Sequence, residues 1–419
     1  MPSLGPGTEC IKLLLSQVSK DMHQPLVPMI FPVLAAHVSG VEFKYPNNEW
    51  RELCGMMANL VGESGCNKGQ LSLLVEAMMR SFREHDDKEM KKMVEAEKAR
   101  STRKTDNQLV KRQPEQAFWF PPADMTNAAF LTNAIACENL GNRTQYLNLP
   151  EIEMADCLCG NHKRVSLTLR NIYDRQRAGA LRATVNGVSG NPLLRANFTI
   201  SSTPYATRKF YRNDLYTGTF GRMIFSYKPR EATRDGRIPR LGNFDDEFLS
   251  KLDVYLERLD QSKGRFIIKQ LNRLIDKMAN DMATMADLSD DDMLWDVAKR
   301  ALNSAWKSGC VLWLLNNQNW TRSMSEMVEW LAYHDIWSKM QVFADLLAKG
   351  DTSLSEAKHR GPKNMLGDLP DTFTQAQLDA IRLDAGKSQE GTYDQLRKWV
   401  KRGLVTYDEV NGTYVKVKK

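Results

Sequence analysis

The segment from Gly62 to Gln70 has residue types that bind phosphate groups. It reads Gly-Glu-Ser-Gly-Cys-Asn-Lys-Gly-Gln, follows the apolar run 56–61 and precedes a stretch, 70–80, with a helical pattern. Glycines let backbone N–H groups close on a phosphate, and a lysine reaches the outer phosphates. We therefore expect a strand, a phosphate-binding loop and a helix. The residues expected to contact a nucleotide are Gly62, Gly65, Asn67, Lys68, Gly69 and Gln70.

Two positions depart from the usual pattern G-x-x-x-x-G-K-[ST]. Asn67 stands where that pattern has glycine, and Gly69 stands where it has the hydroxyl that binds Mg²⁺. Asparagine tolerates a positive φ better than most residues. Mg²⁺ keeps several waters and takes ligands from substrate phosphates, so the missing hydroxyl is not fatal. Adenylate kinases are similar here, since they also place glycine after the lysine. We expect ATP and Mg²⁺ as ligands.

Two glutamates follow the next candidate strand, 144–149. Glu151 comes directly after Pro150 and Glu153 lies two residues further on, so in an extended chain they would face the same side. An ATPase needs one carboxylate to help hold Mg²⁺ and another to orient the attacking water. We expect Glu151 at the metal and both glutamates in catalysis, with their division of roles open; surface glutamates are the alternative.

Two further candidates follow in chain order. Thr203 ends the polar run Ser201-Ser202-Thr203 after the candidate strand 197–200, where it could sense a γ-phosphate. Arg222 opens the candidate strand 222–227 and could neutralise transition-state charge across a subunit boundary. The alternative is an ordinary strand end and a surface arginine.

The bulk composition fits a multidomain chain of the cytoplasm. The chain has 419 residues, a formal charge of +7 and 42% apolar residues, which allow several cores and permit a nucleic-acid partner. No run approaches 18 apolar residues, and the start lacks a secretory signal pattern. Seven scattered cysteines suit free thiols in a reducing compartment. Cys157-Leu158-Cys159 lacks the second pair that structural zinc needs, so we expect no zinc there.

The pattern along the chain predicts α/β architecture with a mostly parallel sheet. Within it, a charged helix without glycine or proline is expected at 88–100, exposed or used for a subunit or nucleic-acid contact. The expected parts are a helical N-terminal cap (1–50), a nucleotide-binding core (51–245), a region helical throughout that forms a lid (246–350), a linker (351–371) and a C-terminal unit (372–419).

The C-terminal unit has the pattern of a winged helix-turn-helix. Helices are expected at 374–384 and 392–402, and strands at 404–407 and 413–417 flank the hairpin turn Asn411-Gly412. Basic side chains there could bind DNA phosphates, although a protein contact is the alternative because acidic residues dilute the charge. The expected DNA-binding residues of this unit are Arg397, Lys398, Lys401, Arg402 and Lys416.

Five segments occur in the order found in helicase-like P-loop proteins of bacterial mobile elements: 62–68, 120–127, 149–153, 201–203 and 221–225. Over residues 1–350 the chain resembles a primase–helicase-associated family of Bacteroides elements, related to virulence-associated protein E and distantly to superfamily 3 helicases. The resemblance implies a P-loop NTPase core of the AAA+/superfamily 3 type that assembles into a homo-oligomer, with a hexameric ring as one candidate form, and acts on DNA in replication or mobilisation.

The same analogy implies a hairpin before the third strand that contacts DNA in the pore. Asn186-Gly187 is a hairpin turn dipeptide, and Arg182 and Arg195 flank it. An ordinary surface hairpin is the alternative. Two functions follow from the sequence: a DNA-associated ATPase motor, or a DNA-binding scaffold that binds nucleotide without hydrolysing it because its loop is degenerate.

Overall fold

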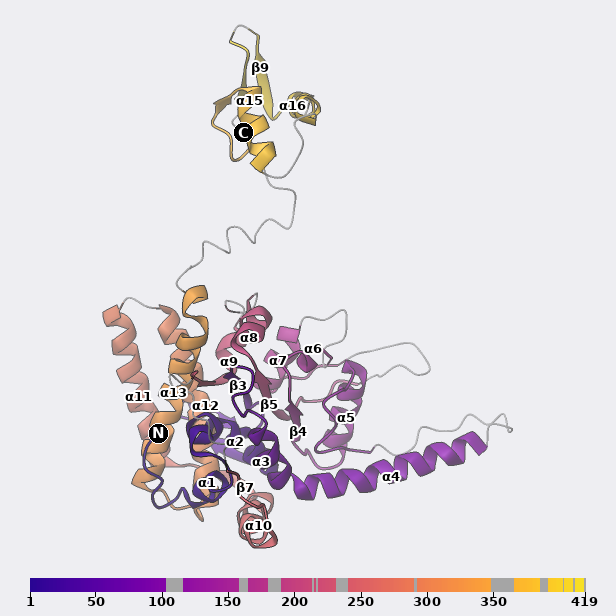
Figure 1. Cartoon of the computed structure of the whole chain (residues 1–419), viewed down its shortest axis with the longest axis vertical. Helices are drawn as coiled ribbons and strands as arrows, with labels where there is room; N and C mark the ends of the chain where they lie inside the picture. The colour runs from indigo at the N-terminus through magenta and orange to yellow at the C-terminus, as the bar shows by residue number, and fades with distance from the viewer. Residues whose placement is uncertain are drawn as a thin grey trace. The chain divides into compact units, whose positions relative to one another are not determined.

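The structure is a computed structural model with two compact units, Met1–Ala344 and Asp345–Lys419 (Figure 1). It describes residues 1–102, 116–157, 165–179, 190–212, 215, 218–230, 240–289, 292–347, 365–384, 391–401, 403–409 and 411–417. The expected parts 1–50 and 51–245 and almost all of 246–350 lie within the first unit, and the expected part 372–419 lies within the second.

A four-stranded parallel sheet forms the centre of the first unit. Its strands are β3 (Met57–Gly62), β4 (Gln145–Leu149), β5 (Ala196–Ser202) and β6 (Ile224–Lys228), in the spatial order β4-β5-β3-β6. Every residue of β3 is buried, and β3 pairs with β5 on one side and with β6 on the other. The predicted α/β class with a parallel sheet is confirmed.

Helices connect the sheet strands, as parallel pairing requires. They are α3 (Gln70–Met78), α4 (Arg80–Thr102), α5 (Asn127–Asn139), α6 (Met154–Cys157), α7 (Val165–Tyr173), α8 (Pro204–Tyr211) and α9 (Thr219–Arg222). The predicted helix at 88–100 is confirmed within α4, which projects from the rest of the unit at the lower right of Figure 1.

The N-terminal segment is part of this core. It comprises α1 (Glu9–Leu15), the 3-10 helix η1 (Lys20–Met22) and α2 (His23–His37). Although prolines usually interrupt a helix, α2 continues through Pro28 and Pro32. An interior proline costs about 3 kcal/mol. Every residue of α2 from Pro25 to His37 is buried, and each large apolar side chain so buried contributes about 1.5–3 kcal/mol, which offsets that cost.

A second sheet joins distant parts of the first unit. Its strands are β1 (Val41–Lys44), β2 (Trp50–Arg51) and β7 (Gly264–Phe266), in the order β2-β1-β7. The sequence predicted an unbroken helical region after residue 245, and β7 contradicts this. Gly264–Phe266 pairs in parallel with β1, so these residues satisfy their backbone groups in a ladder rather than in a helix.

Four long helices complete the first unit: α10 (Asp246–Asp260), α11 (Lys269–Ser289), α12 (Asp292–Leu315) and α13 (Arg322–Leu347). The last three lie together at the left of the unit in Figure 1. The side chain of Asp245 caps the N-terminus of α10, since its Oδ1 accepts a hydrogen bond from Phe248 N at 2.9 Å. Among the helices that the structure describes, none has the length and apolarity to span a lipid bilayer.

A buried ion pair fixes α13 against β6. Lys339 Nζ donates to Asp335 Oδ2 at 2.8 Å, and both side chains are at most 3% exposed. Asp335 Oδ1 also accepts from Phe225 N at 2.8 Å, and Lys339 Nζ contacts Gly221 O at 3.4 Å. The pair therefore holds the amino end of β6, and with it the turn that carries Arg222.

In its described residues, the second unit contains two helices and a small antiparallel sheet. They are β8 (Thr372–Phe373), α15 (Gln375–Asp384), α16 (Thr392–Lys401), β9 (Val405–Asp408) and β10 (Thr413–Lys416), with sheet order β8-β10-β9. The predicted helices and hairpin strands are confirmed. The unit has a core of its own, formed by Met365, Leu369, Phe373, Leu378, Leu396 and Val405.

We expect the Asp335–Lys339 pair to be strongly coupled. Asp335→Asn and Lys339→Met should each lower the free energy of unfolding by about 3–5 kcal/mol, because each leaves one buried charge without a partner. The double variant should cost less than the sum of the two. Urea unfolding followed by tryptophan fluorescence measures all three.

The matched control is Lys251→Met, which breaks the exposed pair with Glu247 on α10. It should change stability by less than about 1 kcal/mol. If the double variant instead lost the full sum of the single costs, the two side chains would not be coupled.

Candidate functional site

The loop between β3 and α3 is the first element of the candidate site. It leaves the carboxyl end of the central strand, the edge at which ligands bind in open parallel sheets. Gly65 has φ 78° and Asn67 has φ 67°, both in the left-handed region. Asparagine accepts this conformation at modest cost, so Asn67 does locally what glycine does in the usual motif.

Lys68 closes the loop on itself. Its Nζ donates to Gly62 O at 2.7 Å and to Glu63 O at 2.8 Å, and lies 3.8 Å from Cys66 Sγ. The ammonium group therefore lies over the end of β3, inside the loop. In this position it presents positive charge within the loop, with two carbonyl oxygens as its partners.

The loop also offers backbone donors. Cys66 N donates to Glu63 O at 3.3 Å. Within the described part of the chain, none of the neighbouring backbone N–H groups donates a hydrogen bond; these are the N–H groups of Ser64, Gly65, Asn67, Lys68 and Gly69. N–H groups at the start of a helix, together with the helix dipole, attract anions. The loop can therefore accept a phosphate group without breaking an existing bond of these donors.

A second lysine supports the loop, and our reading of the sequence missed it. Lys228 ends β6 opposite Gly62 in the strand register, is 6% exposed, and donates to Cys66 O at 3.4 Å. It also pairs with Asp21. Burial alone would raise the pKa of Asp21, but hydrogen bonds from Lys228 and Ser19 outweigh it and lower that pKa. The sequence did contain a signal for Lys228, because a lysine directly follows the candidate strand 222–227.

Gln70, one of the expected nucleotide contacts, has its side chain in the core. Its Oε1 accepts from Ser19 N at 2.9 Å, and its Nε2 donates to Ser19 Oγ at 2.8 Å. These bonds tie the first residue of α3 to the N-terminal segment. Gln70 thus anchors the start of the helix, while Gly62, Gly65, Asn67, Lys68 and Gly69 form the loop itself.

Glu151 and Glu153 lie just beyond β4, at the same edge of the sheet as the loop. They do not stand in extended chain as we predicted, because Met154 N donates to Glu151 O at 3.1 Å and closes a turn into α6. Both glutamates are exposed. In the described residues neither carboxylate has a hydrogen bond or ion pair. With β5 between β4 and β3, two strand spacings of about 5 Å separate their strand from the loop strand.

A buried polar network links the loop strand to the end of β5. Ser202 Oγ donates to Asn59 Oδ1 at 2.8 Å and lies 2.6 Å from Thr207 Oγ1. Asn59 Nδ2 is buried without a partner among the described atoms. Thr203 caps α8, its Oγ1 accepting from Ala206 N at 3.2 Å. The predicted sensor residue thus stands at the carboxyl edge, next to a network that includes β3.

Arg222 lies at the opposite end of the sheet. We predicted a strand from residue 222, and that was wrong at its start: Arg222 ends α9 and β6 begins at Ile224, because Met223 N still bonds to Phe220 O at 3.3 Å. The Arg222 guanidinium binds Asp174 at 2.7 Å and Gly218 O at 2.9 Å. It therefore points away from the loop of its own chain.

The expected DNA contacts of the first unit have different outcomes. Arg182 and the hairpin 183–188 lie outside the described residues. Arg195 donates to Glu52 at 2.8 Å and to Asn142 Oδ1 at 3.1 Å, with 11% of its side chain exposed. Its charge is therefore engaged within the protein.

In the second unit, α16 presents its basic residues to solvent. Arg397, Lys398 and Lys401 are exposed, whereas Leu396 is buried in the core. Lys416 on β10 donates to Leu369 O. Arg402 lies outside the described residues. One face of α16 therefore packs into the core of the unit, and the basic side chains on its exposed face are free to contact a partner.

In the part of the chain that the structure describes, no group of three or more histidine, cysteine, aspartate or glutamate residues is arranged to hold a metal ion. Cys159 and His162 lie outside that part. The described thiols, Cys10, Cys54, Cys66, Cys137 and Cys310, are free.

Comparison with known proteins does not assign a role to this site, because the sequence matches no protein-family model and no curated protein. The site is therefore defined by its geometry: a loop with free N–H groups and Lys68 at the end of a central buried strand, with two unpaired carboxylates on the same edge.

The two glycines that bracket the loop should respond differently to substitution. A Cβ on Gly62 would lie 2.6 Å from Cys66 Sγ, whereas a Cβ on Gly69 meets nothing within 4 Å, and Gly69 has helical φ −56°. Gly62→Ala should therefore cost about 1–3 kcal/mol of stability. Gly69→Ala should be neutral or slightly stabilising. Thermal unfolding measures both.

The decisive variant is Gly62→Ala combined with Cys66→Ala, which removes the clashing sulfur. It should regain most of the lost stability. If the double variant were as unstable as Gly62→Ala alone, the close approach of Cys66 would not be the cause.

Proposed function

We propose that this protein is a DNA-associated ATPase that acts as a helicase-like motor in the replication or mobilisation of a mobile genetic element. The observation that carries the proposal is the loop Gly62–Gly69, in which five backbone N–H groups donate no hydrogen bond to the described residues and whose lysine is at the end of a buried parallel strand. That combination of donors and charge suits the phosphates of a nucleotide.

ATP would bind with its outer phosphates in this loop. The free N–H groups would bind phosphate oxygens, and Lys68 would exchange its bonds to two carbonyl oxygens for charge-assisted bonds to phosphate. Lys228 and Asp21 would hold the loop from below through Cys66 O. Binding in this way needs side-chain movement of Lys68 and little change of the backbone.

Hydrolysis would require the carboxylates at the same edge. Glu151 and Glu153 are exposed and unpaired among the described residues, so one could bind Mg²⁺ through water and the other could orient the attacking water. The metal ion would neutralise charge on the phosphates. The water oxygen would bond to the γ-phosphorus, the bond to the bridging oxygen would break, and a glutamate would accept the proton.

Arg222 would act on a nucleotide bound to another subunit. It sits at the amino end of β6, while the loop lies at the carboxyl end of the neighbouring strand, so it does not face the loop of its own chain. Arginine supplied from a neighbour stabilises the charge of phosphoryl transfer. This arrangement supports a homo-oligomer, with a ring as its natural closed form.

The C-terminal unit would contact DNA as a winged helix. Two helices followed by a hairpin match the order of that motif, and Arg397, Lys398 and Lys401 are exposed on its second helix. Basic side chains there would bind backbone phosphates, and such contacts carry most sequence-independent affinity.

A second function has support of its own: a scaffold that binds nucleotide and DNA without hydrolysis. Gly69 supplies no hydroxyl for Mg²⁺, and Thr203 Oγ1 accepts a bond from Ala206 N to cap its own helix. The two functions differ in turnover and share the same binding surfaces.

Lys68→Ala should weaken binding of ATP by roughly 10- to 100-fold, because charge-assisted hydrogen bonds contribute about 1.5–3 kcal/mol. Calorimetric titration with ATP, with and without Mg²⁺, measures the affinity, and release of phosphate in the presence of DNA measures turnover. The control is Lys251→Ala on exposed α10. Equal affinity and turnover in wild type and Lys68→Ala would refute nucleotide use by this loop.

The variant Asn67→Gly/Gly69→Ser separates the two functions. Both substitutions fit the backbone, since Asn67 has a positive φ and a Cβ at Gly69 has open space. A rise in ATP turnover with unchanged ATP affinity would indicate that the carboxylates are competent. Turnover that stays absent in wild type and in the variant would favour the scaffold.

Replacing Arg397, Lys398 and Lys401 with alanine should weaken DNA binding and flatten its salt dependence. Each lost phosphate contact should reduce the slope of log affinity against log salt by about 0.9. The control removes the same charge from exposed α11 through Lys269→Ala, Arg273→Ala and Lys277→Ala. DNA affinity that falls equally in both triple variants would indicate a net-charge effect rather than a DNA-binding helix.

A further inference from the structure

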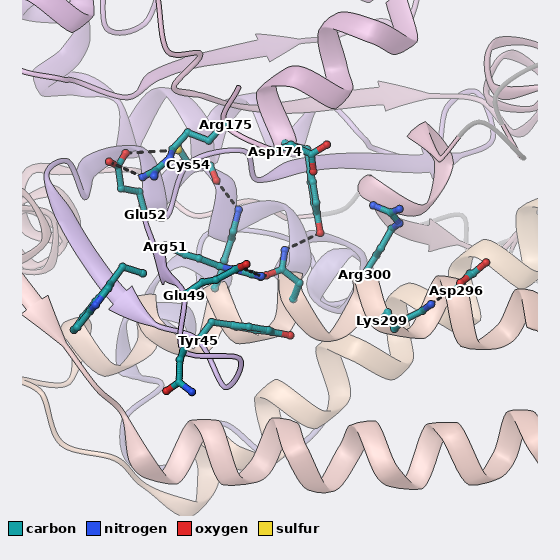
Figure 2. A pocket seen from close by; sticks show the side chains of 15 residues that line it. Tyr45, Glu49, Arg51, Glu52, Cys54, Asp174, Arg175, Asp296, Lys299 and Arg300 are labelled. Carbon is teal, nitrogen blue, oxygen red and sulfur yellow. Dashed lines mark hydrogen bonds and ion pairs between the residues drawn. The ribbon is translucent and has the colours of Figure 1, made fainter. Parts of the chain in front are cut away.

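A polar cavity lies at the end of the central strand opposite the loop. Its volume is about 830 Å³, and Cys54, which lines it, lies just before β3. The strand length places the cavity roughly 20 Å from the loop. Figure 2 shows side chains from the β1–β2 turn, from the turn after α7 and from α12 around it. This cavity is therefore separate from the candidate nucleotide site.

The carboxylates that line this cavity are all paired. Glu49 binds Arg51 at 2.6 Å, and Asp296 binds Lys299 at 2.7 Å. Glu52 binds Arg175 and Arg195, each at 2.8 Å. Asp174 binds Arg222 at 2.7 Å. The negative charge of the lining is thus used, whereas the lining has five cationic side chains, Arg51, Arg175, Lys299, Arg300 and Lys307.

Two of those cations, Lys307 and Arg300, form no ion pair with a carboxylate among the described residues. Lys307 is 5% exposed; its Nζ donates to Cys54 O at 2.6 Å and lies 5.3 Å from the centre of the Tyr173 ring. Arg300 is half-buried one helical turn behind Asp296 on α12, and no ion pair or hydrogen bond joins it to the described residues. Figure 2 shows its guanidinium extended toward the cavity wall near Asp174.

Keeping Lys307 here is costly for the protein alone. Burial lowers the pKa of Lys307 to about 8, and the nearby guanidinium groups of Arg51 and Arg175 lower it further, partly opposed by Cys54 and Asp174. A cationic group that is buried without a counter-charge destabilises the fold. Strongly perturbed groups that face a cavity are more common at functional sites than elsewhere.

We propose that this cavity binds a small organic phosphate through Lys307 and Arg300, which lie two helical turns apart on α12. Guanidinium and ammonium groups together match a doubly charged phosphate, and the aromatic residues Tyr45, Trp50 and Tyr173 offer an apolar wall for the rest of the molecule. The cavity is larger than inorganic phosphate needs. The proposal does not depend on nucleotide binding at the loop.

The probe is inorganic pyrophosphate, titrated calorimetrically into the full chain carrying Lys68→Ala, which weakens phosphate binding at the loop. In that background Lys307→Met and Arg300→Gln should each weaken binding at least about 10-fold. The control Lys299→Gln removes the same charge from the same cavity, but at a side chain already paired with Asp296 and 49% exposed. It should change affinity less than about 3-fold.

Three outcomes would overturn the proposal: no pyrophosphate binding in the Lys68→Ala background, equal weakening in all three variants, or citrate binding as tightly as pyrophosphate, which would assign the cavity to carboxylates. If Lys307→Met fails to fold, Arg300→Gln decides the result, since the Arg300 side chain is half-buried and forms no hydrogen bond or ion pair with the described residues.

Discussion

Double-sided parallel pairing of β3 is the constraint on which the rest of the first unit depends. β3 has β5 and β6 as neighbours, and all six of its residues are buried. Parallel strands cannot be joined by tight turns, so the chain must leave each strand through a helix and return. The loop before α3, the turn after β4 and the cap of α8 are therefore brought to one edge, although they are far apart in sequence.

The same pairing gives the sheet two ends with different chemistry. At the carboxyl end, Lys68 lies inside a loop with unused N–H donors, and Lys228 lies beside that loop. At the amino end, Lys307 and Arg300 face a cavity whose carboxylates are engaged elsewhere. A strand about 20 Å long separates the two, so the two groups of cations would bind separate anions.

Buried charges also position the parts that would have to act together. The Asp335–Lys339 pair holds Phe225 N and so fixes where β6 begins, and Arg222 lies just before that point. Buried pairs contribute little net stability but penalise alternatives in which one partner is left alone. This gives the amino end of β6 a defined geometry, which an arginine acting across a subunit boundary would need.

Local patterns predict the loop, its neighbouring strand and helix, the α/β class and the elements of the C-terminal unit. The patterns are glycine spacing, buried apolar runs and a hairpin dipeptide. Tertiary packing was needed to establish that α2 runs through its prolines, that Gly264–Phe266 forms a strand with β1, and that Glu151 and Glu153 stand in a turn. It alone placed Lys228 beside Gly62 and Lys307 beside Cys54. Such partners are many residues apart. A local pattern can mark Lys228 as a strand-end lysine, but it cannot name the partner, because burial and pairing between distant segments override local preference.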